Sequence, residues 1–151
     1  IIGSSSRVKS LFCAMKYIYD NNLQTEYILI HDVARPVLNI KNINSLINSI
    51  KPGIDGSSLG YPLTNAIKEV GSEHISYSIH KENLWSAFTP QIFRSDKLFD
   101  SLRYILKYNY EIEDDIEALM IKNCSCAMVM SSPDNIKLTY AEDIEVVKRL
   151  L

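Results

Sequence analysis

Cysteine and net charge are both scarce in this chain of 151 residues, and each scarcity excludes a class of protein. The three cysteines are Cys13, Cys124 and Cys126. A small and odd number of cysteines argues against a disulfide framework and fits a reducing compartment. A formal net charge of −2 gives no electrostatic reason to expect nucleic acid or an anionic membrane as a partner. No apolar run is long enough to span a bilayer, and no segment has the pattern of a signal peptide.

Phosphate loops and metal clusters are also missing from the sequence. The five glycines form neither a G-x-G-x-x-G nor a G-K-[ST] pattern, the common Gly-rich phosphate-binding motifs. The C-S-C pair at Cys124 has no second pair at metal-ligand spacing, which favours small residues leading into a strand over a metal site. The chain opens with "IIGSSSR" and no methionine, so we expect it to be a piece of something longer.

What the sequence does contain is an alternation of strands and helices within one domain. Such alternation favours an α/β sheet of mostly parallel strands with right-handed crossovers. The first apolar run, "YILI", predicts a strand buried on both faces. Asn39, Ser95 and Thr139 are predicted N-caps, the last as a capping box with Glu142. Helices are predicted within residues 6–22, 39–51, 95–109, 114–123 and 139–150, and strands at 27–30, 57–63 and 126–130.

One segment breaks this alternation. Ile75, Tyr77 and Ile79 alternate with polar residues, and a turn is expected around Gly71 and Ser72. Period two next to a turn predicts a β-hairpin. We expect this hairpin to be an arm that projects from the domain, over about residues 62–88.

A group of polar residues follows the strand "YILI" directly. Ligands of parallel α/β sheets bind at the carboxyl ends of the strands, where Asp32 and Arg35 would lie. Asp32 is a hard oxygen ligand suited to Mg²⁺ that carries substrate phosphates, and Arg35 could clamp a phosphate with two hydrogen bonds. The alternative is that both residues satisfy backbone groups in a turn, with His31 capping the strand.

Other polar residues have two interpretations each. Lys137 lies between apolar neighbours. It could be a site lysine that binds phosphate or an edge-strand lysine that faces solvent, and the sequence favours the two about equally. Thr89, just before Pro90, could donate its hydroxyl to a phosphate or serve an ordinary turn. Ser10, inside a predicted helix, is more often a packing or back-bonding serine than a ligand. Lys81, just past the hairpin, is most often solvent-exposed.

The order of five motifs, "HDVARP", "PLTNAIKEV", "LWSAFTPQIF", "EDDIEALM" and "DNIKLTYAED", resembles the 2-C-methyl-D-erythritol 4-phosphate cytidylyltransferase family. The opening "GSSSRVKSL" is similar to that family's G-G-x-x-R-x-x-S-V segment. The resemblance runs from Gly3 to the last predicted helix. It implies a Rossmann-like three-layer α/β/α fold, and a homodimer formed through the β-arm. It also implies Mg²⁺ and transfer of CMP from CTP to a sugar-alcohol phosphate, with release of pyrophosphate, in isoprenoid precursor synthesis. The implied location is the cytoplasm, or the stroma in a plastid-bearing organism.

The resemblance also implies roles for single residues. Lys81 and Lys137 would be catalytic, by holding the acceptor phosphate for attack. Asp32 would serve both metal and substrate. The remaining implied substrate-binding residues are Ser10, Val33, Arg35 and Thr89. Such a reaction needs positioning and charge neutralisation and no covalent nucleophile.

Several positions depart from the family pattern. Lys81 replaces an arginine and so loses the bidentate fork, and Asn65-Ala66 replaces an aspartate–threonine pair. Glu113 replaces a threonine and would bring negative charge towards an anionic substrate. Ser4 and Val33 replace a glycine and an alanine. The family's amino-terminal part, with its Gly-rich loop and the residues that stabilise the triphosphate, is missing.

Two interpretations follow from these departures. The chain could be part of a working cytidylyltransferase and be inactive alone, or a non-catalytic relic or dimerising module that keeps the fold. The acceptor is also open, because ribitol 5-phosphate enzymes share H-D-x-x-R-P and T-P-Q. The segments "LW" and "IKEV" favour methylerythritol phosphate, and Ala66 and Lys81 weaken that preference.

Overall fold

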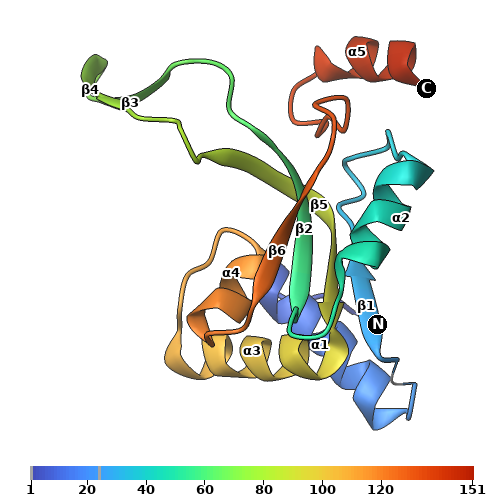
Figure 1. The fold of residues 1–151 in the computed structure, drawn as a ribbon. Coiled ribbons are helices and arrows are strands. Elements are labelled where there is room, and N and C mark those ends of the chain that lie inside the picture. Colours follow the sequence, from blue (N-terminus) through green and yellow to red (C-terminus); the bar gives the residue numbers. More distant parts are fainter. Residues whose placement is uncertain (1, 24) are drawn as a thin grey trace.

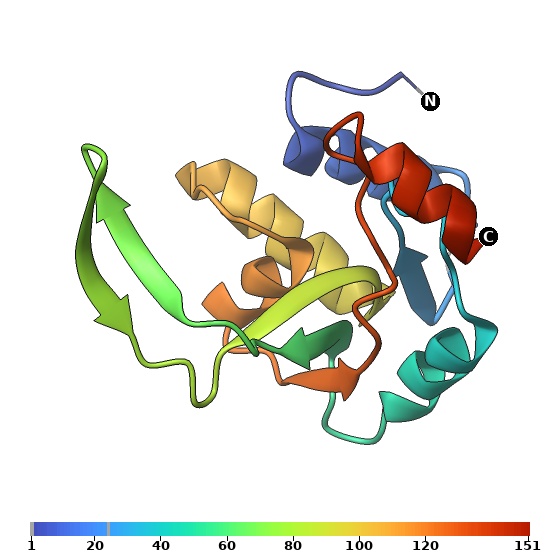
Figure 2. The same ribbon diagram turned by 90° about the horizontal axis from the view of Figure 1, so that it is seen from above.

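A mixed four-stranded sheet between two layers of helices forms the body of the protein (Figures 1 and 2). The computed structural model describes residues 2–23 and 25–151. Along the chain the elements are α1 (Arg7–Asp20), β1 (Tyr27–Ile30), α2 (Ile40–Ser49), β2 (Gly56–Pro62), β3 (Ile67–Gly71), β4 (His74–Ile79), β5 (Trp85–Arg94), α3 (Ser95–Tyr108), α4 (Asp115–Ile121), β6 (Cys126–Met130) and α5 (Asp143–Leu150).

The strand order in the sheet is β1-β5-β2-β6. Strands β2 and β6 pair in parallel, and β5 pairs antiparallel with both β1 and β2. Three strands therefore share one direction, but only β2 and β6 form the predicted parallel pair, because β5 lies between β1 and β2 in the opposite direction. The three-layer α/β/α fold is confirmed.

Each face of the sheet carries its own hydrophobic core, because side chains of neighbouring residues in a strand point to opposite faces. Phe93 on β5 packs under α1, α3 and α4, with Met15, Leu98 and Leu119 among its neighbours. Ile92, the residue before it, packs on the other face against Leu46 of α2. Figure 2 shows these helices on opposite sides of the sheet. The two cores fix the strands of the sheet, and with them the strand ends at which the sequence predicts a site.

Strand β5 is an element that the sequence analysis did not predict. It is interior to the sheet although it contains Pro90, which cannot donate a hydrogen bond to a neighbouring strand. A shift in register solves this problem: Ser58 of β2 pairs with Gln91 and Leu59 pairs with Phe88, so Thr89 and Pro90 are left out of the ladder. Irregular pairing of this kind is how proline is tolerated within sheets.

The predicted arm is present as the hairpin β3–β4, which projects well away from the body (Figure 1). Its turn lies at Ser72 and Glu73, both with positive φ, which suits a tight two-residue hairpin turn. Ile75 and Tyr77 on the arm are largely exposed. The apolar side of the hairpin therefore has no cover within the part of the chain that the structure describes.

Three local predictions are wrong. Strand β1 is the edge of the sheet and not buried on both faces, because Tyr27 and Leu29 remain 37% and 42% exposed. Ser95 is the first residue of α3 and not its N-cap, since its hydroxyl donates to the carbonyl oxygens of Thr25 and Glu26. The capping box predicted for Thr139 and Glu142 does not form. Instead the carboxylate of Asp143, the first residue of α5, accepts hydrogen bonds from the Thr139 and Tyr140 amides.

Candidate functional site

A cavity of about 220 Å³ lies where the loops after β1 and β6 meet the middle of β5. It collects charged side chains from separate parts of the sequence. Its lining consists of Arg7, Asp32, Arg35, Ala87, Phe88, Thr89, Gln91, Glu113, Asp114 and Lys137.

Asp32 is flanked by two cationic side chains in this cavity. Its Oδ2 atom lies 3.5 Å from Nε of Arg35 and 3.9 Å from Nζ of Lys137. The guanidinium of Arg35 also stacks over the ring of Phe88, 5.3 Å from its centroid. Arg35 is therefore held on two sides, whereas Lys137 remains about half exposed and accessible to an incoming anion.

Hydrogen bonds to the backbone fasten the two loops to β5. The amide of Asp32 donates to the Thr89 hydroxyl over 2.9 Å, and Asn135 donates through Nδ2 to the carbonyl oxygen of Thr89. Arg35 donates through Nη1 to the carbonyl oxygen of Asn135. The residues just outside strands β1 and β6 are thus linked into one rigid rim.

An acidic wall from α4 faces this rim. Asp115, whose side chain is fully buried, accepts two hydrogen bonds from Arg7, at 3.0 and 2.6 Å. Burial raises the pKa of the Asp115 carboxyl, and the Arg7 guanidinium opposes that rise. Asp114 caps α4 and accepts from Nε2 of Gln91, which also donates to Ser58.

The charges of the cavity lining sum to zero: Arg7, Arg35 and Lys137 against Asp32, Glu113 and Asp114. A neutral cavity gives no net attraction for an anionic ligand, and a bound divalent cation would supply the positive charge that the lining lacks. Mg²⁺ commonly takes one or two carboxylates and fills its remaining positions with water and substrate phosphate. Asp32 fits that donor set. Among the described residues no group of three or more His, Cys, Asp or Glu side chains could form a metal cluster.

The structure gathers four of the sequence-predicted site residues in this cavity, namely Asp32, Arg35, Thr89 and Lys137, and leaves three outside it. The hydroxyl of Ser10 donates to the Ser6 carbonyl and accepts from the Ser4 amide, which is the back-bonding arrangement. Val33 is 98% exposed. Lys81 lies at the base of the arm and donates to the Thr64 carbonyl oxygen.

Lys137 lies neither in a strand nor at a sheet edge. It belongs to the loop between β6 and α5, whose Leu138 amide donates to the Ala34 carbonyl. Sequence reasoning assigned no site position to Arg7, Gln91 and Asp114, although the quoted segments "GSSSRVKSL", "LWSAFTPQIF" and "EDDIEALM" contain them. Glu113 is one of the residues that line the cavity.

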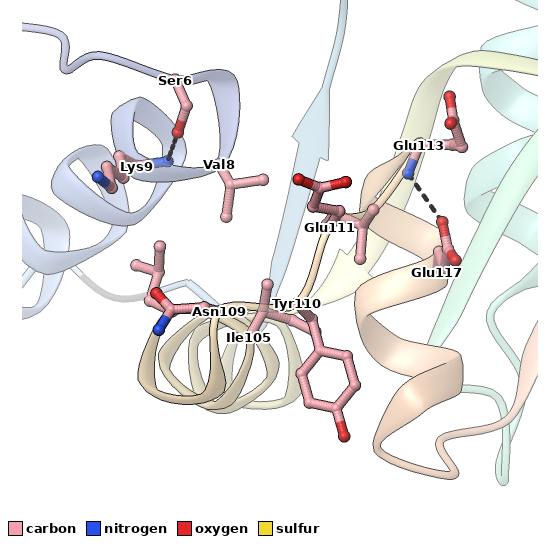
Figure 3. Close-up of a pocket in the computed structure, with 11 residues that line it drawn as sticks. Ser6, Val8, Lys9, Ile105, Asn109, Tyr110, Glu111, Glu113 and Glu117 are labelled. Carbon is pink, nitrogen blue, oxygen red and sulfur yellow. Dashed lines mark hydrogen bonds between the residues drawn. The ribbon is translucent and has the colours of Figure 1, made fainter.

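A larger cavity, of about 650 Å³, lies beside this site between the start of α1 and the end of α3 (Figure 3). Its floor is apolar, with Val8 and Ile105. Its charged lining is three carboxylates, Glu111, Glu113 and Glu117, against the single cation Lys9. Figure 3 shows Glu113 and Glu117 side by side, joined by a 2.8 Å hydrogen bond from the Glu113 amide. Such a lining would repel phosphate, so we assign the smaller cavity as the candidate site.

Comparison with known proteins gives a consistent result. A sequence profile described as "IspD: 2-C-methyl-D-erythritol 4-phosphate cytidylyltransferase" matches residues 1–151. The chain is 32% identical over 150 residues to the protein of that name from Acinetobacter baumannii (strain ATCC 17978), covering 99% of the chain and 63% of that protein. It is 30% identical to the protein of that name from Vesicomyosocius okutanii, with 97% and 60% covered. The chain thus spans less than two thirds of the length of these curated relatives.

Solved structures give the same fold. A crystal structure of 4-diphosphocytidyl-2C-methyl-D-erythritol synthase superposes with a TM-score of 0.89 at 26% identity, covering 99% of this chain and 67% of that one. The 2-C-methyl-D-erythritol 4-phosphate cytidylyltransferase of Thermus thermophilus also superposes with a TM-score of 0.89, at 19% identity. Its coverage is 99% of this chain and 71% of that one, and at this identity it shows the fold alone. In the described residues no helix has the length and apolarity to cross a membrane.

Proposed function

The chain belongs to the 2-C-methyl-D-erythritol 4-phosphate cytidylyltransferase family, and from that membership we propose that it forms the acceptor-binding and metal-binding side of an enzyme that transfers CMP from CTP to 2-C-methyl-D-erythritol 4-phosphate. The observation that carries the proposal is the convergence of Asp32, Arg35, Thr89 and Lys137 on one cavity, from positions up to 105 apart in sequence (137 − 32).

The reaction requires two polyanions to meet. An oxygen of the acceptor phosphate attacks the α-phosphorus of CTP, a new P–O bond forms, and the bond to pyrophosphate breaks. Catalysis of phosphoryl and nucleotidyl transfer consists mainly of positioning and of neutralising charge. Lys137, half-exposed and cationic, would hold the acceptor phosphate for this attack. Arg35, fixed by Phe88 and Asn135, would orient the phosphate against the rim.

Asp32 is the residue that we propose for Mg²⁺. Its Oδ2 atom is shared between two cations in the free protein, at 3.5 and 3.9 Å, which are long contacts that a metal could replace. Bound Mg²⁺ would supply Lewis-acid stabilisation of charge on the phosphates. The neutral sum of the cavity charges supports this assignment, because the protein's own cations are already balanced.

We further propose that the arm pairs with a second copy of the chain and that Lys81 acts there. Lys81 does not line the cavity of its own chain. The apolar side of the hairpin is exposed, and a two-stranded hairpin alone is marginally stable in water. A homodimer formed through the arm would cover that surface.

The test uses two proteins: the chain as it stands, and the chain joined to the upstream segment of the Acinetobacter baumannii relative. Each is incubated with CTP, Mg²⁺ and methylerythritol phosphate, and pyrophosphate release is measured. We expect no release from the chain alone, and release from the joined protein that is abolished by EDTA. Release by the chain alone would overturn the division of the site between two segments.

Two alternatives have their own outcomes in the same assay. A joined protein that folds but releases no pyrophosphate with either acceptor would indicate a non-catalytic relic, an interpretation that the presence of Glu113 in the cavity lining favours. Faster release with ribitol 5-phosphate than with methylerythritol phosphate would indicate the ribitol enzyme; Ala66 and Lys81 already weaken the preference for methylerythritol phosphate.

A further inference from the structure

Arg7 lies in the candidate site but has no part in the function described so far. Its side chain belongs to the first turn of α1, lines the same cavity as Asp32 and Lys137, and is 44% exposed. Building on the proposed function, we infer that Arg7 is a phosphate-binding residue of this site and that Asp115 is the residue that positions it.

The geometry of the pair supports a positioning role for Asp115. Nη1 and Nη2 of Arg7 donate to separate carboxylate oxygens, at 3.0 and 2.6 Å, so the plane of the guanidinium is fixed. Two parallel hydrogen bonds of this kind specify orientation as well as energy. The guanidinium has more N–H donors than these two bonds use, and Nε is among the donors left for a phosphate.

Stability alone is a poor reason for this ion pair. The Asp115 carboxylate is completely removed from solvent, and burying a charge costs much of what the pairing returns. The other end of the pair is nearly half exposed and opens into the cavity. The buried Asp115 therefore fixes the guanidinium of Arg7, and the exposed side of that guanidinium can bind a ligand.

The position of Arg7 complements the other two cations. Arg35 and Lys137 both lie beside the same oxygen of Asp32, on the loops after β1 and β6. Arg7 comes from α1 and is tied to α4, so its charge enters the cavity from a different wall. Joining two phosphate-bearing substrates requires cations around both phosphates, and Arg7 supplies the one that the Asp32 group does not.

Binding of inorganic pyrophosphate, with Mg²⁺ present, tests this inference by isothermal titration calorimetry on the chain itself. We expect Arg7→Ala to weaken binding roughly tenfold to a hundredfold, as loss of charge-assisted hydrogen bonds to a phosphate does. Arg7→Lys should also weaken it, because lysine keeps the charge but not the fork. Lys9→Ala is the matched control: it removes an equal charge from the same helix but outside this cavity, and should leave the affinity unchanged.

Arg7→Ala leaves the buried Asp115 unpaired and could unfold the chain, so the double variant Arg7→Ala/Asp115→Asn is the decisive one. It removes both charges, and we expect it to melt close to wild type while binding pyrophosphate as weakly as Arg7→Ala. Asp115→Asn alone keeps the charge of Arg7 but releases its clamp, and should weaken binding severalfold, which a purely structural pair would not do.

The outcomes separate this inference from the proposed function. Wild-type affinity in the double variant, together with lost binding in Lys137→Ala, would overturn the role of Arg7 and leave the phosphate site standing. Absence of pyrophosphate binding in the wild-type chain would contradict the phosphate site itself, and therefore also the role inferred for Arg7.

Discussion

Burial changes the chemistry of single side chains in this protein, and Cys126 gives a direct test. The fold raises the pKa of the Cys126 thiol from 9.0 to about 11, chiefly by burial and secondly through Cys124 and Asp55. At pH 8 the reactive thiolate of Cys126 should therefore be about a hundredfold scarcer in the folded chain than in the unfolded chain. We expect iodoacetamide to alkylate Cys126 correspondingly more slowly in buffer than in urea, as followed by tandem mass spectrometry. Equal rates in the two solvents would show that the thiol is not shielded.

Lys137 provides the corresponding test in the candidate site. In the chain joined to the upstream segment of its relative, Lys137→Ala should lower pyrophosphate release by roughly a hundredfold, because a charge contact to the transition state is lost. Lys51→Ala, which removes an exposed lysine outside the cavity, is the control and should keep the parent rate. A near-normal rate for Lys137→Ala would contradict the proposed role.

The sequence could place Asp32, Arg35, Thr89 and Lys137 in one site because the order of the five motifs resembles a known family, whereas each residue alone also fits an ordinary structural role. Asp32 and Arg35 follow an apolar run, and Thr89 precedes Pro90. Arg7 and Asp115 lie inside the "GSSSRVKSL" and "EDDIEALM" segments, but nothing in either segment links the two residues: they are 108 positions apart, and only the folded chain brings α1 against α4. Sequence patterns report periodicity along one element, whereas an ion pair between two elements depends on how they pack.

At the scale of elements, β2 is enclosed by strands on both sides, and Gly60 marks its tightest point. A Cβ atom at Gly60 would lie 2.7 Å from Sδ of Met128 and 2.8 Å from the carbonyl oxygen of Ser86. Methionine can move aside, but the Ser86 backbone belongs to β5 and cannot do so without breaking the ladder. We expect Gly60→Ala to lower the free energy of unfolding by about 1–3 kcal/mol, the usual cost of overpacking.

Urea unfolding followed by circular dichroism measures this cost. Gly71→Ala is the control, since a Cβ there would approach only the Ser76 hydroxyl, at 3.2 Å, on the exposed arm. That variant should unfold near the wild-type midpoint. A Gly60→Ala chain with the wild-type midpoint would show that β2 and β5 can separate locally without loss.

Helices were the easier elements to predict, and β5 shows why strands were harder. A helix such as α3 repeats its apolar face several times, so Leu98, Leu102 and Ile105 mark it clearly. Strand β5 begins with exposed residues, becomes buried only from Phe88 onwards and contains Pro90. Its place in the sheet depends on the register shift opposite Leu59, and such a shift is set by pairing with β2 and leaves no pattern in β5 itself.

At the scale of the whole molecule, the arm is the part that the body does not stabilise. The two strands of the arm pair with each other in a sheet of their own, separate from the four-stranded sheet. Val70, Ile75 and Tyr77 are each more than half exposed, which is unusual for three large apolar side chains on a single hairpin. A second copy of the chain is the partner that we propose for this surface.

If the proposed dimer forms through the arm, deleting residues 65–80 should convert it into a monomer. The deletion is geometrically mild, because Pro62 and Trp85 at the base of the arm are already paired across β2 and β5 and a short turn can join them. The four-stranded sheet and both cores lie outside the deleted segment, so the thermal midpoint of the body should change little. Light scattering after size exclusion gives the mass of each form. Glu73→Ala, at the polar tip of the arm, is the control and should remain dimeric, and a dimer that survives the deletion would show that another surface holds the two copies together.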